Sequence, residues 1–399
     1  MQHEVSAERR QILKEYCEAN SLIASSTVAL CQGEAKVTVV IPVYNEESFL
    51  SATIASLGAV TDPIEIVIVD NGSTDRTKEV VDESAKKIKW PITILDCPQK
   101  GPVNARKRGM DEIIAQYVRA NPDVSRHHYI GMIDADTTVP TNWVEAIVET
   151  FRATEAAALG GVHDSPRWID EQIEAGTGIK SFFSELSHVA FYLTKRGYVQ
   201  LQTKGANAAI EVAAYAEIGG SKQPKNAAGE FVKGSDRLFG QALRARGHKV
   251  VFLPVMTVSS PRRPLFSLIQ RKDTVHYSLI QNWVDCRVDE ATMLKEAIDT
   301  LSHEEWMKNK LGREIMYVHH NVITPILRGE LNGRIFEKLM GREHDAVLAL
   351  KKEQENARTQ DVKNIDTDRV ARKFGEEFAS QVFNTARNMM FLDESIRLD

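Results

Sequence analysis

The stretch Tyr129-Ile-Gly-Met-Ile-Asp-Ala-Asp136 joins a short apolar run directly to two carboxylates. Two earlier runs, Val37-Thr-Val-Val-Ile-Pro-Val43 and Ile64-Glu-Ile-Val-Ile-Val69, are similarly rich in β-branched residues. Runs this apolar are typical of parallel strands that are buried on both faces. Helical patterns lie between them, so we expect βαβ units, a parallel sheet and helices on both of its faces.

The pattern divides the chain into three predicted parts. Residues 1–35 are expected to form a helical leader and residues 36–264 an α/β domain with a mainly parallel central sheet. Residues 265–399 show no strand pattern and are expected to form a helical extension. The strands are predicted at 37–43, 64–69, 92–95, 129–133, 157–162, 198–202, 206–210 and 249–253.

Composition excludes several classes of protein. The chain has 399 residues, of which 43% are hydrophobic and 26% charged, as in ordinary globular proteins. The formal net charge of -5 argues against a nucleic-acid coat. None of the four cysteines forms a C-x-x-C pair, which predicts reduced thiols in a cytoplasmic protein without a zinc or disulfide framework. No apolar run reaches the roughly 18 residues of a transmembrane helix.

Polar residues follow three of the predicted strands, at 42–47, 70–75 and 134–136. Ligands of an open α/β sheet bind at these carboxyl ends of the strands. Asp134 and Asp136 can hold a divalent cation through hard oxygen ligands, or can form an Asp-rich turn. Asp70 can accept a hydrogen bond from a nucleotide base, or can cap the turn that follows it. Lys100-Gly-Pro-Val-Asn-Ala-Arg106 opens a predicted helix without a dinucleotide-binding or P-loop glycine pattern.

These segments together resemble the family 2 glycosyltransferases of the GT-A fold. The resemblance covers residues 36–262 and implies a catalytic domain that binds a nucleotide-diphosphate sugar. The matching motifs, in the order and approximate spacing of the family, are Ile41-Pro-Val-Tyr-Asn-Glu-Glu47, Val69-Asp-Asn-Gly-Ser-Thr-Asp75, Gly101 through Arg106 to Gly109, and Asp134-Ala-Asp136.

The resemblance also implies roles for individual residues. Nucleotide contacts would come from Pro42, Tyr44, Glu46, Asp70, Arg106 and Asp134. Asp136, with Asp134, would ligate Mg²⁺ or Mn²⁺ bound to the diphosphate. Asp236 would be the base that deprotonates an acceptor hydroxyl, which gives inversion by single displacement. Gly205 and Asn207 would lie near the donor sugar, and Arg262 or Arg263 would contact the diphosphate in place of the usual metal-ligating histidine.

Several alternatives remain open from the sequence. A retaining transferase on the same scaffold, a nucleotide-sugar-binding protein with degenerate catalysis, and a nucleotidyltransferase are all possible, although Tyr44-Asn-Glu-Glu47 replaces the glycine-rich loop of the last class. The acceptor is an unspecified hydroxyl compound. Weak peripheral membrane contact is considered for 265–285, where apolar residues follow Arg262-Arg263. Phe182, Phe183, Phe191 and Tyr192 form either an acceptor surface or a packed face. His128 is expected to be a surface or packing residue.

Overall fold

The computed structural model describes residues 2–122, 127–199, 201, 203, 205–221, 235–270, 289–328, 331–341, 344–359 and 367–392. Its contacts divide the chain into two compact units. The first consists of residues 1–163 and 202–259, and the second of residues 164–201 and 260–399. The division differs from the predicted one, because it joins the leader to the α/β part and places 164–201 with the helical part.

The first unit contains a mixed sheet of eight strands in the order β3-β2-β1-β4-β7-β6-β8-β5. The strands β3, β2, β1 and β4 pair in parallel, whereas β7 is antiparallel to β4 and to β6. The elements of this unit are α1 (Gln2–Ala19), β1 (Val37–Val43), α2 (Leu50–Gly58), β2 (Ile64–Asp70), α3 (Thr77–Ala85), β3 (Ile92–Asp96), α4 (Pro102–Ala120), β4 (Tyr129–Met132), β5 (Thr137–Thr138), α5 (Trp143–Thr154), β6 (Ala158–Asp164), β7 (Ala208–Glu211), α8 (Val212–Glu217), α9 (Ser235–Ala245) and β8 (Val250–Ser259).

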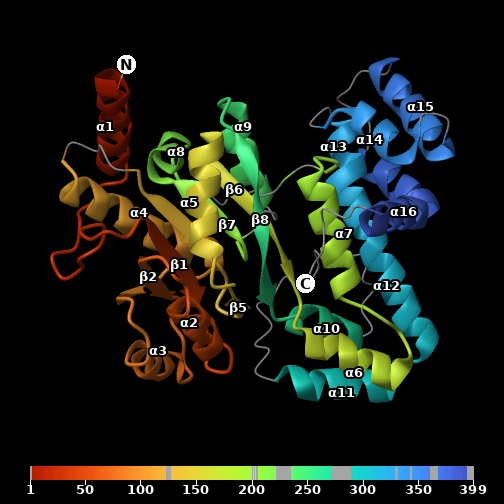
Figure 1. The fold of residues 1–399 in the computed structure, drawn as a ribbon, viewed down its shortest axis with the longest axis horizontal. Coiled ribbons are helices and arrows are strands. Elements are labelled where there is room, and N and C mark those ends of the chain that lie inside the picture. The colour runs from red at the N-terminus through yellow and green to blue at the C-terminus, as the bar shows by residue number, and fades with distance from the viewer. Residues whose placement is uncertain are drawn as a thin grey trace. The chain divides into compact units, whose positions relative to one another are not determined.

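The apolar runs of β1 and β2 are buried on both faces, as the sequence predicts. Alternate side chains enter two separate cores: Val40 and Val67 pack with Ile113 of α4, whereas Val39 and Ile66 pack against α2. Figure 1 shows α4 on one side of these strands and α2 on the other. Two-sided burial explains why these strands read as continuous apolar runs and not as alternating ones. The predicted strand at 198–202 is not formed at Tyr198 or Val199, and residues 200 and 202 lie outside the described ranges.

The central strand β1 contains a proline near its end. Pairing of β1 with β2 continues through Pro42 to the pair Val43–Asp70. Pairing with β4 stops earlier, at Val40–Met132. Asp134 and Asp136 therefore lie beyond the ladder between β1 and β4, in the connection to β5.

The predicted leader helix packs into the first unit. Leu13 and Tyr16 of α1 are buried against α4 and α8. The Tyr16 hydroxyl donates a hydrogen bond to Asp111 of α4 at 2.6 Å. A further ion pair joins Arg9 to Glu211 at the end of β7.

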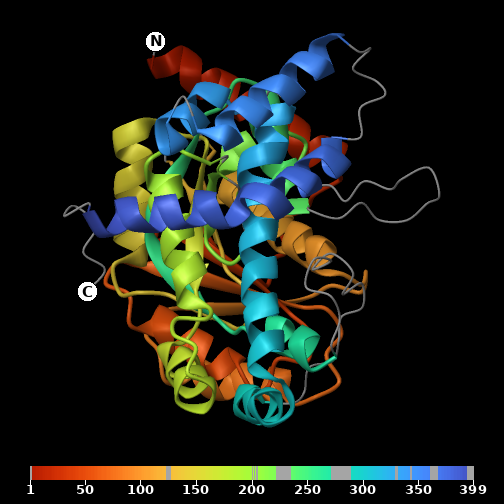
Figure 2. The same ribbon diagram turned by 90° about the vertical axis from the view of Figure 1, so that its right-hand side faces the viewer.

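The second unit is helical. Its elements are α6 (Arg167–Thr177), α7 (Ser184–Lys195), α10 (Arg262–Ile269), α11 (Glu290–Thr300), α12 (His303–Val318), the π-helical segment η2 (His319–Ile323), α13 (Thr324–Leu327), α14 (Gly333–Met340), α15 (Asp345–Thr359) and α16 (Thr367–Leu392). Figure 2 shows α16 lying across α12, with which it makes extensive contacts. Pro325 lacks the N–H that an α-helix would use at that point, and the preceding turn is π-helical.

Several of the apolar residues considered for an acceptor or membrane surface are buried in this unit. Phe182 and Phe183 are each 1% exposed, and the Phe182 ring meets Trp306 edge-on at 4.9 Å. Leu265 and Leu268 are buried in the same cluster. The packing interpretation therefore holds for the phenylalanines. Phe266 and Ile269 are only partly buried, so the membrane contact considered for 265–285 stays a prediction. Residues 271–285 lie outside the described ranges.

Among the helices that the structure describes, none is both long and apolar enough to cross a membrane.

A group of charged side chains lies between α7, α12 and α16. The Glu185 carboxylate binds Lys310 at 2.6 Å and Arg387 at 3.0 Å. Burial opposes ionisation of Glu185, but these hydrogen bonds outweigh it and lower its pKa. For the neighbouring Glu314, burial together with the negative charge of Glu185 outweighs the nearby cations and raises the pKa to about 7.

This arrangement predicts a pH-dependent loss of stability. Between the unfolded pKa of about 4.3 and the folded pKa of about 7, the folded chain keeps the Glu314 proton that the unfolded chain releases. The contribution of Glu314 to stability should therefore fall as the pH rises from 5 to 8. Thermal unfolding of Glu314→Gln should lack this component, so the variant should gain stability relative to wild type at pH 8. Glu304→Gln, an exposed position on the same helix, is the control, and identical pH profiles for the two variants would contradict the prediction.

Candidate functional site

The loops after β1 and β2 are tied together by reciprocal hydrogen bonds. The Asn45 N–H donates to Ser73 Oγ at 3.0 Å, and the Thr74 N–H donates to Asn45 Oδ1 at 2.8 Å. Asn45 has a φ of 55°, a left-handed conformation that asparagine tolerates better than most residues. The parallel pairing of Val43 with Asp70 places these two loops at the same edge of the sheet.

Asn71 fastens the loop after β3 to the end of β2. Its buried amide donates to the carbonyls of Cys97 at 2.9 Å and Gln99 at 2.8 Å, and its Oδ1 accepts the Gly101 N–H at 2.7 Å. Gly101 has a φ of 117°, which favours glycine, and Pro102 begins α4 directly after it. Asn71 therefore fixes where α4 starts.

Lys100, in the same loop, lies over the ring of Tyr44. Its Nζ is 4.6 Å from the ring centroid and donates to the Asn71 carbonyl at 2.9 Å. A cation over an aromatic face is an attractive arrangement. Neither Asn71 nor Lys100 was singled out from the sequence, although both stand inside the motifs that were.

The start of α4 carries Arg106, which forms an ion pair with Asp134 after β4. The Asp134 side chain is 37% exposed and that of Arg106 12% exposed. The Arg106 side chain is thus mostly buried, whereas the Asp134 carboxylate is partly open to solvent. A Cβ on Gly205 would overlap the guanidinium, so glycine at this position leaves the room that Arg106 occupies. The structure thus brings together Arg106, Asp134 and Gly205, all three predicted site residues.

The segment that contains Asp136 is anchored on both sides. The Thr53 hydroxyl of α2 donates to the Ala135 carbonyl at 2.8 Å. Thr137, the residue after Asp136, pairs with Ser259 of β8, and their buried hydroxyls are 2.7 Å apart. Asp136 itself is half-buried. The carboxylates of Asp134 and Asp136 are therefore held on a fixed stretch of backbone, partly open to solvent.

The predicted contact of Asn207 with the donor is corrected. The Asn207 side chain has no exposed surface; it donates to the carbonyls of Val162 and Val255 at 2.8 Å and accepts from Trp143 Nε1 at 2.9 Å. Its amide cross-links β6, β8 and α5 inside the core. The sequence alone does not show whether an asparagine directly before a strand binds a donor or cross-links the core, and here its hydrogen-bond partners decide.

The remaining predicted residues lie in three places. The first place is the ends of β1 and β2, with Pro42, Tyr44, Glu46 and Asp70. Asp70 is buried, its carboxylate accepts the Ser73 N–H at 3.1 Å, and it lies 3.4 Å from Lys78 Nζ. Asp236 lies in the first turn of α9, and its side chain is outside the described part of the structure. Arg262 and Arg263 begin α10 in the second unit, Arg262 buried and Arg263 exposed. Their contacts with a donor remain predictions.

Two hollows of the first unit differ in size and position. A cavity of about 20 Å³ beside Arg106 has room for about one water molecule and cannot hold a nucleotide. A larger hollow of about 490 Å³ is lined by residues that precede β1 and β2, including Lys36 and Pro63, and by α5. It lies at the amino ends of the strands, away from the carboxylates, so neither hollow defines the site.

The site consists of backbone loops and carboxylates at the carboxyl ends of β1, β2 and β4. Its partly open acids can hold a divalent cation, and Arg106 can offer a guanidinium to a phosphate. A sheet with parallel β3-β2-β1-β4 strands, an antiparallel β7 and acids after β4 has the arrangement of a GT-A-like glycosyltransferase fold.

The comparison of this sequence with models of protein families agrees with a glycosyltransferase. Residues 38–209 match the family model described as glycosyl transferase family 2. Membership of that family therefore applies to residues 38–209, which hold the parallel strands of the sheet.

Individual relatives are distant. The minor teichoic acid biosynthesis protein GgaA of Bacillus subtilis is 21% identical over 39% of this chain and 35% of its own length. A glucosyl-dolichyl phosphate glucuronosyltransferase of Haloferax volcanii is 27% identical over 46% of this chain and 55% of its own length. This chain thus spans about a third to a half of these curated relatives. Among solved structures, the mannosyltransferase PcManGT of Pyrobaculum calidifontis, solved with GDP-Man and Mn²⁺, is 15% identical, with a TM-score of 0.43 over 99% of this chain and 100% of its own.

Asn71 supplies a test of the site's framework. Asn71→Ala should lower the free energy of unfolding by about 2 kcal/mol, because it leaves two carbonyls and one N–H without their partner. Hydrogen exchange followed by mass spectrometry should also become faster at Gly101. Asn142→Ala is the control, since Asn142 is exposed and its side chain makes no capping bond. Unchanged exchange at Gly101 in Asn71→Ala would show that the side chain does not fix this loop.

Proposed function

We propose that the chain transfers a sugar from a nucleotide-diphosphate sugar to an acceptor hydroxyl. The observation that carries the proposal is the Arg106–Asp134 pair beside Asp136, held at the carboxyl ends of parallel strands within a family 2 domain. The Asp134 carboxylate is partly open to solvent, so a ligand can reach this pair. The loop that contains Asn45 and the buried Asp70 supplies the neighbouring surface for the nucleotide.

Asp134 and Asp136 have the chemistry of a site for Mg²⁺ or Mn²⁺. Both are carboxylates, both are partly open to solvent, and the backbone between them is fixed by the Thr53 hydroxyl. A divalent cation there would neutralise charge on the diphosphate leaving group. Glycosyltransferase-like neighbours solved with Mn²⁺, PcManGT among them, are consistent with this choice.

Asp136→Ala tests the assignment of these acids. The variant should lose sugar transfer and should bind a nucleoside diphosphate more weakly in the presence of Mn²⁺, because a hard ligand is removed. Transfer can be followed by release of nucleoside diphosphate from a panel of nucleotide-sugars, including hydrolysis of the donor. Asp82→Ala, an exposed acid on α3, should keep wild-type activity. Full activity of Asp136→Ala would exclude this site.

For the chemical step we propose a single displacement. Asp236 accepts the proton of the acceptor hydroxyl as its oxygen bonds to the anomeric carbon, while the bond from that carbon to the diphosphate oxygen breaks. The nucleoside diphosphate leaves with the electron pair. This assignment rests on the position of Asp236 in the first turn of α9 and on the family resemblance.

Asp236→Asn should reduce the transfer rate by at least about 100-fold, because loss of a general base usually costs this much. Binding of the donor, measured by calorimetry, should stay within a few fold of wild type, in contrast to Asp136→Ala. The anomeric configuration of the product, read by NMR, should be opposite to that of the donor. Retention of configuration would instead support a retaining transferase.

A further inference from the structure

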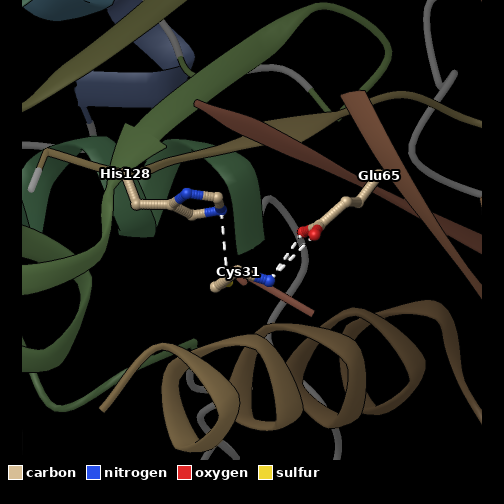
Figure 3. Close-up of side chains that lie close together, drawn as sticks. All are labelled: Cys31, Glu65 and His128. Atoms are coloured by element: carbon tan, nitrogen blue, oxygen red, sulfur yellow. Dashed lines mark hydrogen bonds between the residues drawn. The ribbon is translucent and has the colours of Figure 1, made fainter. Parts of the chain in front are cut away.

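We propose that Cys31, Glu65 and His128 form a second metal site, suited to Zn²⁺, at the amino end of the sheet. Cys31 lies in the segment between α1 and β1, Glu65 is the second residue of β2, and His128 directly precedes β4. Figure 3 shows the three side chains converging from these separate parts of the first unit. They are the one group of three potential metal ligands that the described residues bring this close together.

The distances fit a shared ion. One ligand atom from each residue lies within 4.8 Å of the other two. Cys31 Sγ and His128 Nε2 are 3.4 Å apart. In a tetrahedral zinc site, with bonds of about 2.0–2.3 Å, neighbouring ligand atoms are separated by about 3.3–3.6 Å. The sulfur and the nitrogen therefore already stand at the spacing of two corners of such a site.

The charges also favour a dication. Cys31, Glu65 and His128 are all buried. A thiolate and a carboxylate together neutralise Zn²⁺, so the complete site would carry no net charge, which suits a group removed from water. Binding releases the thiol proton of Cys31 to solvent and uses neutral His128, with its proton on Nδ1. The mixture of sulfur, imidazole and oxygen is typical of zinc and unlike the all-oxygen ligands of Mg²⁺.

Neighbouring groups hold the ligands in place. Thr38, paired in register with Glu65, donates its hydroxyl proton to Glu65 Oε2 at 2.8 Å. The Cys31 N–H points at both Glu65 oxygens at 2.9 Å. Hydrogen bonds of this kind commonly orient carboxylate ligands of metals. Cys31 has a φ of 60°, a strained conformation of the type found at ligand clamps.

The Thr38 hydroxyl also lies 2.8 Å from His128 Nε2. Since that hydroxyl proton goes to Glu65, the Nε2–H donates to Thr38 when no metal is present. Metal binding would exchange this one hydrogen bond for a metal–nitrogen bond. The Nε2 proton leaves to solvent and Nδ1 takes up a proton, so the imidazole stays neutral and the bond from Thr38 to Glu65 stays intact. The fourth coordination position is then open to the Thr38 oxygen or to a water molecule.

The experiment measures metal in the untagged protein, purified without chelator. Elemental analysis should find about one Zn²⁺ per chain. After removal of the metal with a chelator, Co²⁺ alone should produce a thiolate-to-cobalt charge-transfer band in the near ultraviolet, and Zn²⁺ should abolish that band. Zn²⁺ should also raise the midpoint of thermal unfolding of the metal-free protein.

Variants locate the metal. Cys31→Ser and His128→Gln should lower the affinity for Zn²⁺ by at least about 100-fold, since each removes a direct ligand. Cys17→Ser, a half-buried cysteine of α1 outside the cluster, should bind like wild type. Asp136→Ala should also keep its Zn²⁺, which separates this site from the proposed transferase site. Wild-type protein that neither contains nor takes up Zn²⁺ or Co²⁺ would overturn the proposal, as would a cobalt band that persists in Cys31→Ser.

Discussion

The parallel pairing of β1 with β2 on one side and β4 on the other is the constraint on which the first unit depends. It fixes Val43 opposite Asp70 and brings the chain after β4 to the same edge. Three loops that are distant in sequence thereby become neighbours. Hydrogen bonds of Asn45 and Asn71 join the loops after β1, β2 and β3, so the rigid sheet positions chemistry that the loops themselves supply.

The sequence predicts this edge well because local signals define it. Buried parallel strands are continuous apolar runs, and whatever follows them stands at the carboxyl edge, so Asp70, Asp134 and Asp136 are found from their neighbours in the chain. Asn207 shows where such reasoning fails. Its partners are carbonyls of Val162 and Val255, and nothing within a few residues of position 207 reveals them.

The same limit applies to the division of the chain. Residues 164–201 follow the sheet in sequence but belong with the helices after 260, because Phe182 and Phe183 pack with Trp306. His128 is a second example: taken alone it has the appearance of a packing residue, and only the register of Thr38 with Glu65 reveals its polar surroundings. Contacts made across long stretches of sequence decide each of these cases.

Pro42 has a consequence for how β4 ends. Alternate residues of a strand direct their backbone groups to opposite neighbours, and the Val43 carbonyl accepts the Asn71 N–H on the β2 side. Position 42 therefore faces β4, where proline has no hydrogen to offer. The pairing of β1 with β4 therefore ends at Met132, and the backbone that carries Asp134 and Asp136 turns away from β1. The missing N–H of Pro42 thus ends the pairing of β4 with β1, and Asp134 and Asp136 lie in a loop outside the sheet.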